Sequence, residues 1–165
     1  MKNYKIVFSN LDGTLIDTIT GEKVPKGVWD MKINFSVLDF IKNEIKPEYI
    51  CIITNQGMVE YGLDEDILVV KLNYVMEAVG NYCNAPCYAY YSISNDETNK
   101  DRKPNVGMLD KFLMYLALNK NKDYNKTDMC LIGDNDIDKK TAENYGINHF
   151  NVKDILLKNK ENYEK

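Results

Sequence analysis

Residues 5–15 read Lys-Ile-Val-Phe-Ser-Asn-Leu-Asp-Gly-Thr-Leu, and this stretch decides the fold. Residues 5–10 form a short run with three consecutive apolar side chains, which is typical of a buried strand in a parallel sheet. Asp12 and Gly13 follow, and Gly is typical of turns. Ligands of open α/β sheets bind outside the carboxyl ends of the strands. The stretch therefore predicts the first strand of such a sheet and one wall of a ligand site.

Apolar runs alternate with helical patterns along the rest of the chain, which predicts an α/β fold with parallel strands covered by helices. Further strands are expected over 49–54, 87–93, 128–133 and 147–150. Helices are expected over 35–45, from Asp64 to a stop at Gly80, over 106–119, up to about Tyr145 before Gly146, and in the tail. The segments between strands are too short for a full cap domain, so an open site is expected.

The composition indicates one soluble globular domain. The 165 residues suit a single domain over 1–165, and 44 % hydrophobic with 28 % charged residues excludes bulk disorder. No apolar run approaches the roughly 18–20 residues of a membrane helix, and residues 1–8 do not form a secretory signal, so a cytoplasmic location is expected. The net charge of −4 disfavours non-specific binding along duplex DNA but allows recognition of one phosphorylated end.

The four cysteines are expected to be reduced thiols, since no secretory signal precedes them. Cys51 and Cys130 lie within predicted buried strands, so they are expected to pack in the core. Cys83 and Cys87 lie four positions apart, but a zinc site needs two more ligands and His149, the only histidine, is far along the chain. No zinc is therefore expected.

A polar stretch over 18–26, with Gly21 and Pro25, predicts a turn or small hairpin, so that a flap is expected near 16–30. An open site beside such a flap would admit the end of a large molecule, such as a nucleic-acid terminus.

Polar side chains follow the predicted strands and open one helix. Asp134 and Asp138 are oxygen ligands one helical turn apart, which suits Mg²⁺. Lys103 is a cation at a helix entrance, Thr54 offers a hydroxyl, and Asp12 is a carboxyl suited to acid–base work. Any one of these features alone is commonly explained by a turn, a helix cap or a solvated surface lysine. Together, each at the end of its own strand or in the loop that follows, they predict a phosphate and metal site.

This set resembles the haloacid dehalogenase superfamily of phosphohydrolases. The first motif of that family, Asp-x-Asp-Gly-Thr-Leu after an apolar strand, corresponds to residues 10–15. Its later motifs are matched by Thr54, by Lys103 and by Asp134 with Asp138, all in family order and covering nearly the whole chain. The resemblance implies a Rossmann-like parallel sheet with strand order 3-2-1-4-5, helices on both faces and a minimal cap.

Three stretches resemble the polynucleotide kinase 3′-phosphatase branch of that superfamily more closely. They are residues 14–29, which include Thr-Gly-Glu-Lys at 20–23, Ile-Thr-Asn-Gln-Gly at 53–57, and Arg-Lys-Pro at 102–104. Histidinol- and heptose-bisphosphate phosphatases share Thr-Asn-Gln and Arg-Lys-Pro but usually carry a Cys-rich zinc loop before the Lys, which this sequence lacks. The sequence contains no kinase P-loop.

The resemblance implies a Mg²⁺-dependent phosphomonoesterase with an aspartyl-phosphate intermediate. Residue 10 would attack phosphorus, while Asp12 would protonate the leaving oxygen and then activate water. Residue 10, the backbone carbonyl of Asp12 and Asp134 would hold Mg²⁺, with Asp138 in support. Thr54 and Lys103 would hold phosphoryl oxygens. The substrate-binding residues expected are Thr54, Asn55, Gln56, Arg102 and Lys103.

The chain departs from the family at position 10, where the nucleophilic aspartate is replaced by Asn10. An amide oxygen is a far poorer nucleophile than a carboxylate, so the chain as written is expected to bind substrate and to turn it over barely or not at all. One interpretation is an engineered exchange that traps substrate, and the other is a natural non-catalytic protein that binds phosphorylated ends. The first is favoured because the other expected site residues are intact, namely Asp12, Thr54, Lys103, Asp134 and Asp138.

The substrate expected is a 3′-phosphate on DNA or RNA, with a small nucleotide or sugar phosphate as the alternative. Aromatic rings can stack on bases, and the candidates for this role are Trp29, Tyr61, Tyr90 and Tyr91. The alternative for Tyr90 and Tyr91 is packing between sheet and helix. Candidates for contacts with flanking phosphates, or else for a solvated rim, are Lys23, Lys26, Lys100 and Arg102.

Overall fold

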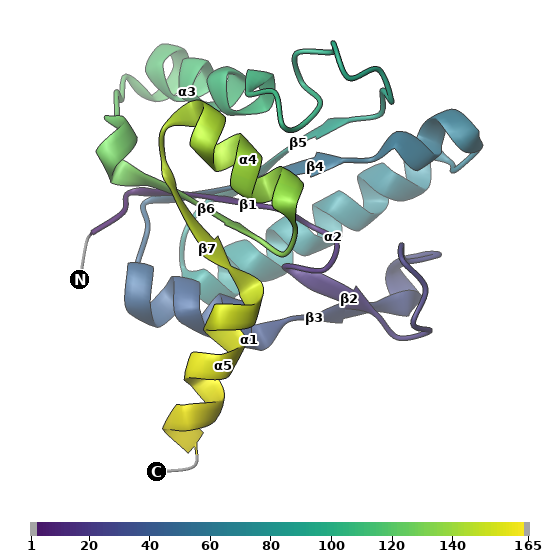
Figure 1. Ribbon diagram of the computed structural model, residues 1–165, viewed down its shortest axis with the longest axis horizontal. Helices are drawn as coiled ribbons and strands as arrows, with labels where there is room; N and C mark the ends of the chain where they lie inside the picture. The colour runs from purple at the N-terminus through teal and green to yellow at the C-terminus, as the bar shows by residue number, and fades with distance from the viewer. Residues whose placement is uncertain (1–2, 164–165) are drawn as a thin grey trace.

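Five parallel strands form the central sheet of the computed structural model, which describes residues 3–163 and the side chains up to residue 158 (Figure 1). They are β1 (Ile6–Ser9), β4 (Tyr49–Asn55), β5 (Cys87–Ser92), β6 (Met129–Gly133) and β7 (Asn148–Asn151). Their spatial order is β5-β4-β1-β6-β7. It differs from the expected 3-2-1-4-5 only in its labels, because two more strands form a separate hairpin. The ends of the predicted domain, 1–2 and 164–165, lie outside the described residues.

Helices cover both faces of the sheet (Figure 1). One face carries α1 (Phe35–Asp39), the π-helical turn η2 (Phe40–Ile45), α2 (Glu65–Cys83) and α5 (Val152–Tyr163). The other carries α3 (Gly107–Lys120) and α4 (Asp136–Tyr145). Because successive strand residues point to opposite faces, Val7 packs in the hydrophobic cluster under α1, α2 and α5, and Phe8 packs in the cluster under α3 and α4. No helix in the described part of the chain is long and apolar enough to cross a bilayer.

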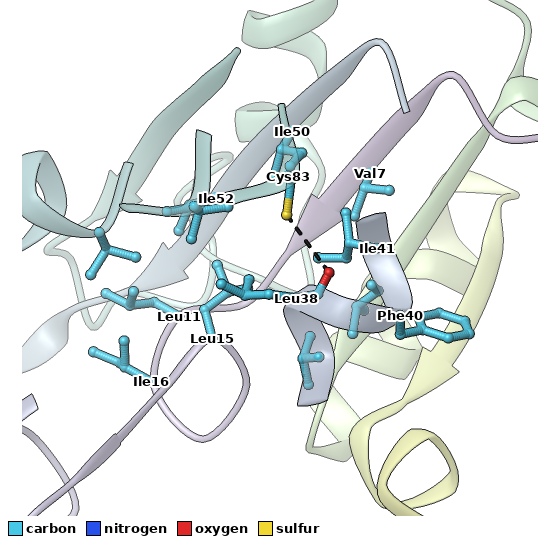
Figure 2. Packing of buried hydrophobic residues seen from close by; sticks show 14 of the residues in the cluster. Val7, Leu11, Leu15, Ile16, Leu38, Phe40, Ile41, Ile50, Ile52 and Cys83 are labelled. Carbon is cyan, nitrogen blue, oxygen red and sulfur yellow. Dashed lines mark hydrogen bonds between the residues drawn. The ribbon is translucent and has the colours of Figure 1, made fainter. Parts of the chain in front are cut away.

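The loop after β1 is anchored by its own apolar side chains. Figure 2 shows Leu11, Leu15 and Ile16 in the same buried cluster as Leu38 and Ile52. All five are fully buried, so the loop that carries positions 10 and 12 is fixed by core packing and not only by hydrogen bonds. The first motif is therefore part of the core.

The predicted stop of α2 at Gly80 is wrong, because the helix continues to Cys83 and ends at Asn84 in the left-handed conformation. A Cβ on Gly80 would lie 3.3 Å from the carbonyl oxygen of Ala85. The glycine therefore permits the returning chain to approach the helix closely. At the end of α4, by contrast, Gly146 adopts the predicted left-handed stop with φ 77°.

Cys51 and Cys130 are fully buried within β4 and β6, which confirms their predicted core packing. Burial raises the pKa of both thiols. Cys83 is also buried and donates to the carbonyl of Leu38 over 3.8 Å (Figure 2).

The expected flap is an antiparallel hairpin of β2 (Ile16–Thr18) and β3 (Met31–Ile33), closed by the 3-10 turn η1 (Val28–Asp30). Asp30 holds it together, because its fully buried carboxylate accepts from the Thr20 N–H at 2.9 Å, the Thr20 hydroxyl at 3.0 Å and the Lys26 N–H at 3.1 Å. Burial opposes the charged form, but the hydrogen bonds from Lys26 and Thr20 outweigh it and lower the pKa of Asp30 below its ordinary value.

We expect Asp30→Asn to loosen the flap, because an amide cannot accept hydrogen bonds at both ends. Hydrogen-exchange protection factors of the Thr20 and Lys26 amides should fall, while the exposed Asp17→Asn in the same hairpin should leave them unchanged. A lowered pKa stabilises the folded state above the ordinary aspartate pKa of about 4. Flap protection should therefore be lost as the pH falls below that value through the lowered pKa. Unchanged protection in Asp30→Asn would contradict this role.

Candidate active site

The carboxyl ends of the strands bring together the residues expected from the sequence. Position 10 follows β1, Thr54 lies near the end of β4, and Asp134 follows β6. Lys103 comes from the loop between β5 and α3, and Asp138 from the first turn of α4. The side chains of Asn10, Asp134, Lys103 and Asp138 form one hydrogen-bonded network. Thr54 is joined to Asp12 through Gln56.

Asn10 lies at the centre of this network and is 6 % exposed. Its Nδ2 donates to the backbone carbonyl of Asp12 at 2.9 Å and to Oδ1 of Asp134 at 3.0 Å, while its Oδ1 accepts from Nζ of Lys103 at 3.0 Å. These partners fix the orientation of the amide, because a lysine ammonium only donates and the two oxygens only accept. The side-chain oxygen of residue 10 thus lies beside a buried cation.

Lys103 and Asp138 form a buried ion pair, with 2.5 Å between Nζ and Oδ1. The Asn55 side chain holds the backbone of Lys103 in place, donating to its carbonyl and accepting from its N–H, each at 2.9 Å. A Cβ on Gly133 would lie 2.4 Å from Oδ2 of Asp138, so only glycine leaves space for this carboxylate. In this structure Asp138 fixes the Lys103 ammonium, and Asn55 positions Lys103.

The Asp12 carboxylate is held by one hydrogen bond and one ion pair. Nε2 of Gln56 donates to its Oδ2 at 2.7 Å, and Nζ of Lys71 lies 3.6 Å from its Oδ1. The same Gln56 nitrogen also donates to the hydroxyl of Thr54 at 2.9 Å. Gln56 therefore couples the acid–base candidate to the phosphate-binding candidate.

Lys71 and Thr14 contact this network without having been expected as site residues. The Thr14 hydroxyl is buried and donates to Oδ1 of Asp134 at 3.1 Å. Lys71 lies on α2 between Leu68 and Leu72, in the apolar stripe that faces the core. A charged residue in such a stripe is the sequence signal that could have identified it.

Other candidates lie elsewhere. The Arg102 guanidinium donates to the carbonyl of Ser94 at 2.8 Å, which braces the loop. Tyr90 packs against Phe112 in the core, which agrees with the alternative that it fills the interface between sheet and helix. Tyr91 packs on the other face of the sheet, against the cluster that contains Val7, and its hydroxyl donates to the Glu65 carboxylate at 2.9 Å.

Two aromatic candidates stay open to solvent: Trp29 is 67 % exposed and Tyr61 is 76 % exposed. They come from η1 in the flap and from the 3-10 turn η3 (Gly57–Tyr61), which follows β4. Of the basic candidates, Lys26 forms an exposed ion pair with Glu22 at 3.6 Å.

The oxygen atoms around Asn10 fit a hard divalent cation. The carbonyl of Asp12 and the carboxylate of Asp134 both point at the amide nitrogen of Asn10, whose N–H groups satisfy them. With aspartate at position 10, only oxygen atoms would converge there, and their mutual repulsion favours Mg²⁺. In the described residues no group of three His, Cys, Asp or Glu side chains forms a ready metal cluster. A site here therefore depends on a carboxylate at position 10 and on the backbone carbonyl.

The comparisons with known proteins agree with this fold. The sequence model of the polynucleotide kinase 3 phosphatase family matches residues 5–162. Among solved structures, D,D-heptose 1,7-bisphosphate phosphatase from B. bronchiseptica, complexed with magnesium and phosphate, superimposes with a TM-score of 0.67 at 18 % identity, covering 89 % of this chain and 79 % of that one. A putative HAD-like phosphatase from Mesorhizobium loti has a TM-score of 0.61 at 20 % identity, covering 89 % and 71 %. No curated protein matches the chain.

The fold and the strand-end motifs define a haloacid dehalogenase-like phosphatase domain. Within that class the chain belongs to the polynucleotide kinase 3 phosphatase family, whose match extends over nearly all of its length.

Proposed function

We propose that this site belongs to a Mg²⁺-dependent phosphomonoesterase that removes 3′-phosphates from DNA or RNA ends, and that Asn10 leaves the chain able to bind but not to hydrolyse. The observation that carries the proposal is the position of the Asn10 side chain between the buried Lys103 ammonium and Asp134. A carboxylate there would have a cation beside it and a phosphoryl group within reach. The family match supports the substrate class.

With aspartate at position 10, its carboxylate oxygen would form a bond to phosphorus while the bond from phosphorus to the ester oxygen breaks. Asp12 would give its proton to that leaving oxygen and then take one from the water that hydrolyses the aspartyl-phosphate. Lys103 and Thr54 would hold the phosphoryl oxygens. Mg²⁺ held by residue 10, the Asp12 carbonyl and Asp134 would offset the charge on those oxygens.

Asn10 changes one member of an otherwise complete set. The other expected site residues are all present, whereas natural binding proteins of enzyme families commonly lose several catalytic groups; these residues are Asp12, Thr54, Lys103, Asp134 and Asp138. This pattern supports an aspartate-to-asparagine exchange that traps substrate over a natural non-catalytic binding protein.

The leaving group would lie in a pocket of about 310 Å³ between Asp12 and the flap. The pocket is lined by Asp12, Gly13, Ile16, Asp17, Thr18, Gly21, Glu22, Lys23 and Pro25. Its acidic side chains outnumber its single lysine, which disfavours several phosphates close to the scissile one. This feature supports a short footprint on nucleic acid and makes a small nucleotide or sugar phosphate the second candidate.

Binding to the chain as it stands tests the substrate class. In the presence of Mg²⁺, a 3′-phosphorylated oligonucleotide should bind at least about tenfold more tightly than the same strand with a 3′-hydroxyl, since charge-assisted hydrogen bonds to phosphate contribute more than about 1.4 kcal/mol. A 5′-phosphorylated strand is the matched control and should bind like the unphosphorylated one. Equal affinity for all three strands, measured by fluorescence anisotropy, would contradict a 3′-phosphate specificity. Tighter binding of a 3′-nucleoside monophosphate or a sugar phosphate would favour the small substrate.

Metal binding should depend on position 10. Asn10→Asp removes the N–H groups that satisfy Asp12 and Asp134 and adds a negative charge, so the metal-free variant should be less stable. Mg²⁺ should then stabilise the Asn10→Asp variant by about 2.7 kcal/mol when its free concentration is about 100 times Kd. Thermal unfolding with and without Mg²⁺ measures this, with Asn10→Ala as the uncharged control. An equal effect of Mg²⁺ on all three forms would contradict the assigned metal ligands.

A further inference from the structure

A lysine lies where an apolar residue is expected on the inner side of α2. Lys71 is 2 % exposed and lies in the same buried stripe as Leu68, Leu72 and Val75. Lysine is almost never fully buried unless it is paired, because removing an ammonium from water is costly. The structure must therefore supply a partner for this charge.

The partner is Asp12, whose Oδ1 lies 3.6 Å from the Lys71 ammonium. No other carboxylate pairs with Lys71 among residues 3–158. The ion pair joins the middle of α2 to the loop after β1. The Lys71 ammonium therefore reaches the candidate active site from a helix that carries none of the family motifs.

The two oxygens of Asp12 have different surroundings. Gln56 donates to Oδ2 at 2.7 Å, whereas Oδ1 is buried and accepts no hydrogen bond within the described structure. The Lys71 ammonium therefore lies beside the one Asp12 oxygen that accepts no hydrogen bond in the described structure.

The ion pair between Lys71 and Asp12 becomes important when a negatively charged phosphate enters the site. The network holds the carboxylates of Asp12, Asp134 and Asp138 and the ammonium groups of Lys71 and Lys103. A phosphate dianion would repel Asp12, and without Lys71 only the neutral Gln56 would hold that carboxylate in place.

We propose that Lys71 is a positioning residue, which together with Gln56 holds the carboxyl group of Asp12 toward the leaving oxygen. The inference rests on the proposed phosphatase function and adds to it a group from α2 that acts through Asp12. Lys71 itself does not contact the reacting atoms in this role.

The test compares two leaving groups in the active Asn10→Asp background. An alkoxide from a 3′-phosphorylated oligonucleotide needs a proton from Asp12, whereas p-nitrophenolate from p-nitrophenyl phosphate leaves without one. Lys71→Met keeps the aliphatic length of the side chain and removes the charge. We expect it to slow the first turnover of the oligonucleotide by about 10–100-fold. The p-nitrophenol burst should change less than about threefold, because general-acid catalysis contributes little there.

Two further variants separate positioning from a general structural effect. In an Asp12→Asn background, Lys71→Met should cost less than about threefold with either substrate, since the group it positions is gone. Lys158→Met removes a lysine from an exposed ion pair with Glu44 and should leave both rates unchanged. Equal losses with both substrates, no loss with the oligonucleotide, or an undiminished loss in the Asp12→Asn background would each overturn the proposal.

A structural readout makes the test independent of turnover. In a crystal structure of Lys71→Met in the Asn10 chain soaked with inorganic phosphate, the Asp12 carboxylate should leave its 2.7 Å contact with Gln56, whereas the soaked Asn10 chain should keep it. A carboxylate that keeps this contact would overturn the positioning role. If Lys71→Met does not fold, Lys71→Gln replaces it in both the kinetic and the structural experiment. If Asn10→Asp is inactive on both substrates, the proposed function fails, and the crystal structure still decides the role of Lys71.

Discussion

Asn10→Asp should give the chain phosphatase activity. We expect phosphate release from a 3′-phosphorylated oligonucleotide to rise by about 10³-fold or more, because a carboxylate replaces an amide as nucleophile. The side-chain oxygen of residue 10 lies 3.0 Å from the Lys103 ammonium, and aspartate has nearly the size of asparagine, so the new carboxylate would have a cation beside it. The measurement is steady-state release of inorganic phosphate with Mg²⁺, comparing the two forms at equal concentration.

Two comparisons make this result interpretable. Asn10→Ala should remain inactive, since it has neither the amide nor the carboxylate, and chelation of Mg²⁺ should abolish the activity of the Asn10→Asp variant. If the Asn10→Asp variant prefers a 3′-nucleoside monophosphate, the polymer specificity is wrong. No release from either compound or from a sugar phosphate would contradict the assignment of residue 10 as the nucleophile position.

Lys103→Met should destabilise the protein and abolish phosphate binding. The Lys103 ammonium is 3 % exposed and pairs with Asp138, which is fully buried, so removing it leaves a buried carboxylate without a counter-charge. Breaking a buried pair in this way costs about 3–5 kcal/mol. Urea unfolding measures the stability loss, and titration with the 3′-phosphorylated oligonucleotide measures the loss of binding.

A second substitution shows whether the unpaired charge is the cause. Adding Asp138→Asn to Lys103→Met should recover part of the lost stability, because the uncompensated carboxylate is gone, but it should not restore phosphate binding. The exposed ion pair of Lys158 and Glu44 provides the matched control, and Lys158→Met should hardly change the free energy of unfolding. A Lys103→Met protein as stable as that control would contradict a structural role for the buried pair.

The sheet could be predicted from sequence because its strands are short, almost uninterrupted apolar runs that end in polar residues. β1, β4 and β6 are buried on both faces, so their patterns have little ambiguity. Their carboxyl ends must meet at one edge of a parallel sheet, which is why Asn10, Thr54 and Asp134 were predictable as neighbours.

Other features depend on contacts that no local pattern encodes. Gly80 has the signature of a helix stop, but its role is to allow the approach of Ala85 from the following segment. Arg102 follows a strand beside Lys103, but the shape of its loop turns the guanidinium toward Ser94. Lys71 lies far from Asp12 in the sequence, and only the packing of α2 on the sheet brings the two charges together.

Locating the phosphate during the reaction tests directly whether residue 10 is the nucleophile position. In the doubly substituted form Asn10→Asp, Asp12→Asn, the nucleophile is present and the group that activates water is not, so the phosphorylated intermediate should accumulate with a substrate such as p-nitrophenyl phosphate. Acid quenching, proteolysis and mass spectrometry should find phosphate on the peptide that contains residue 10, and none on that peptide from the Asn10 chain. Phosphate on another residue, or product formed without any phosphorylated peptide, would contradict the assignment of residue 10 as the nucleophile position.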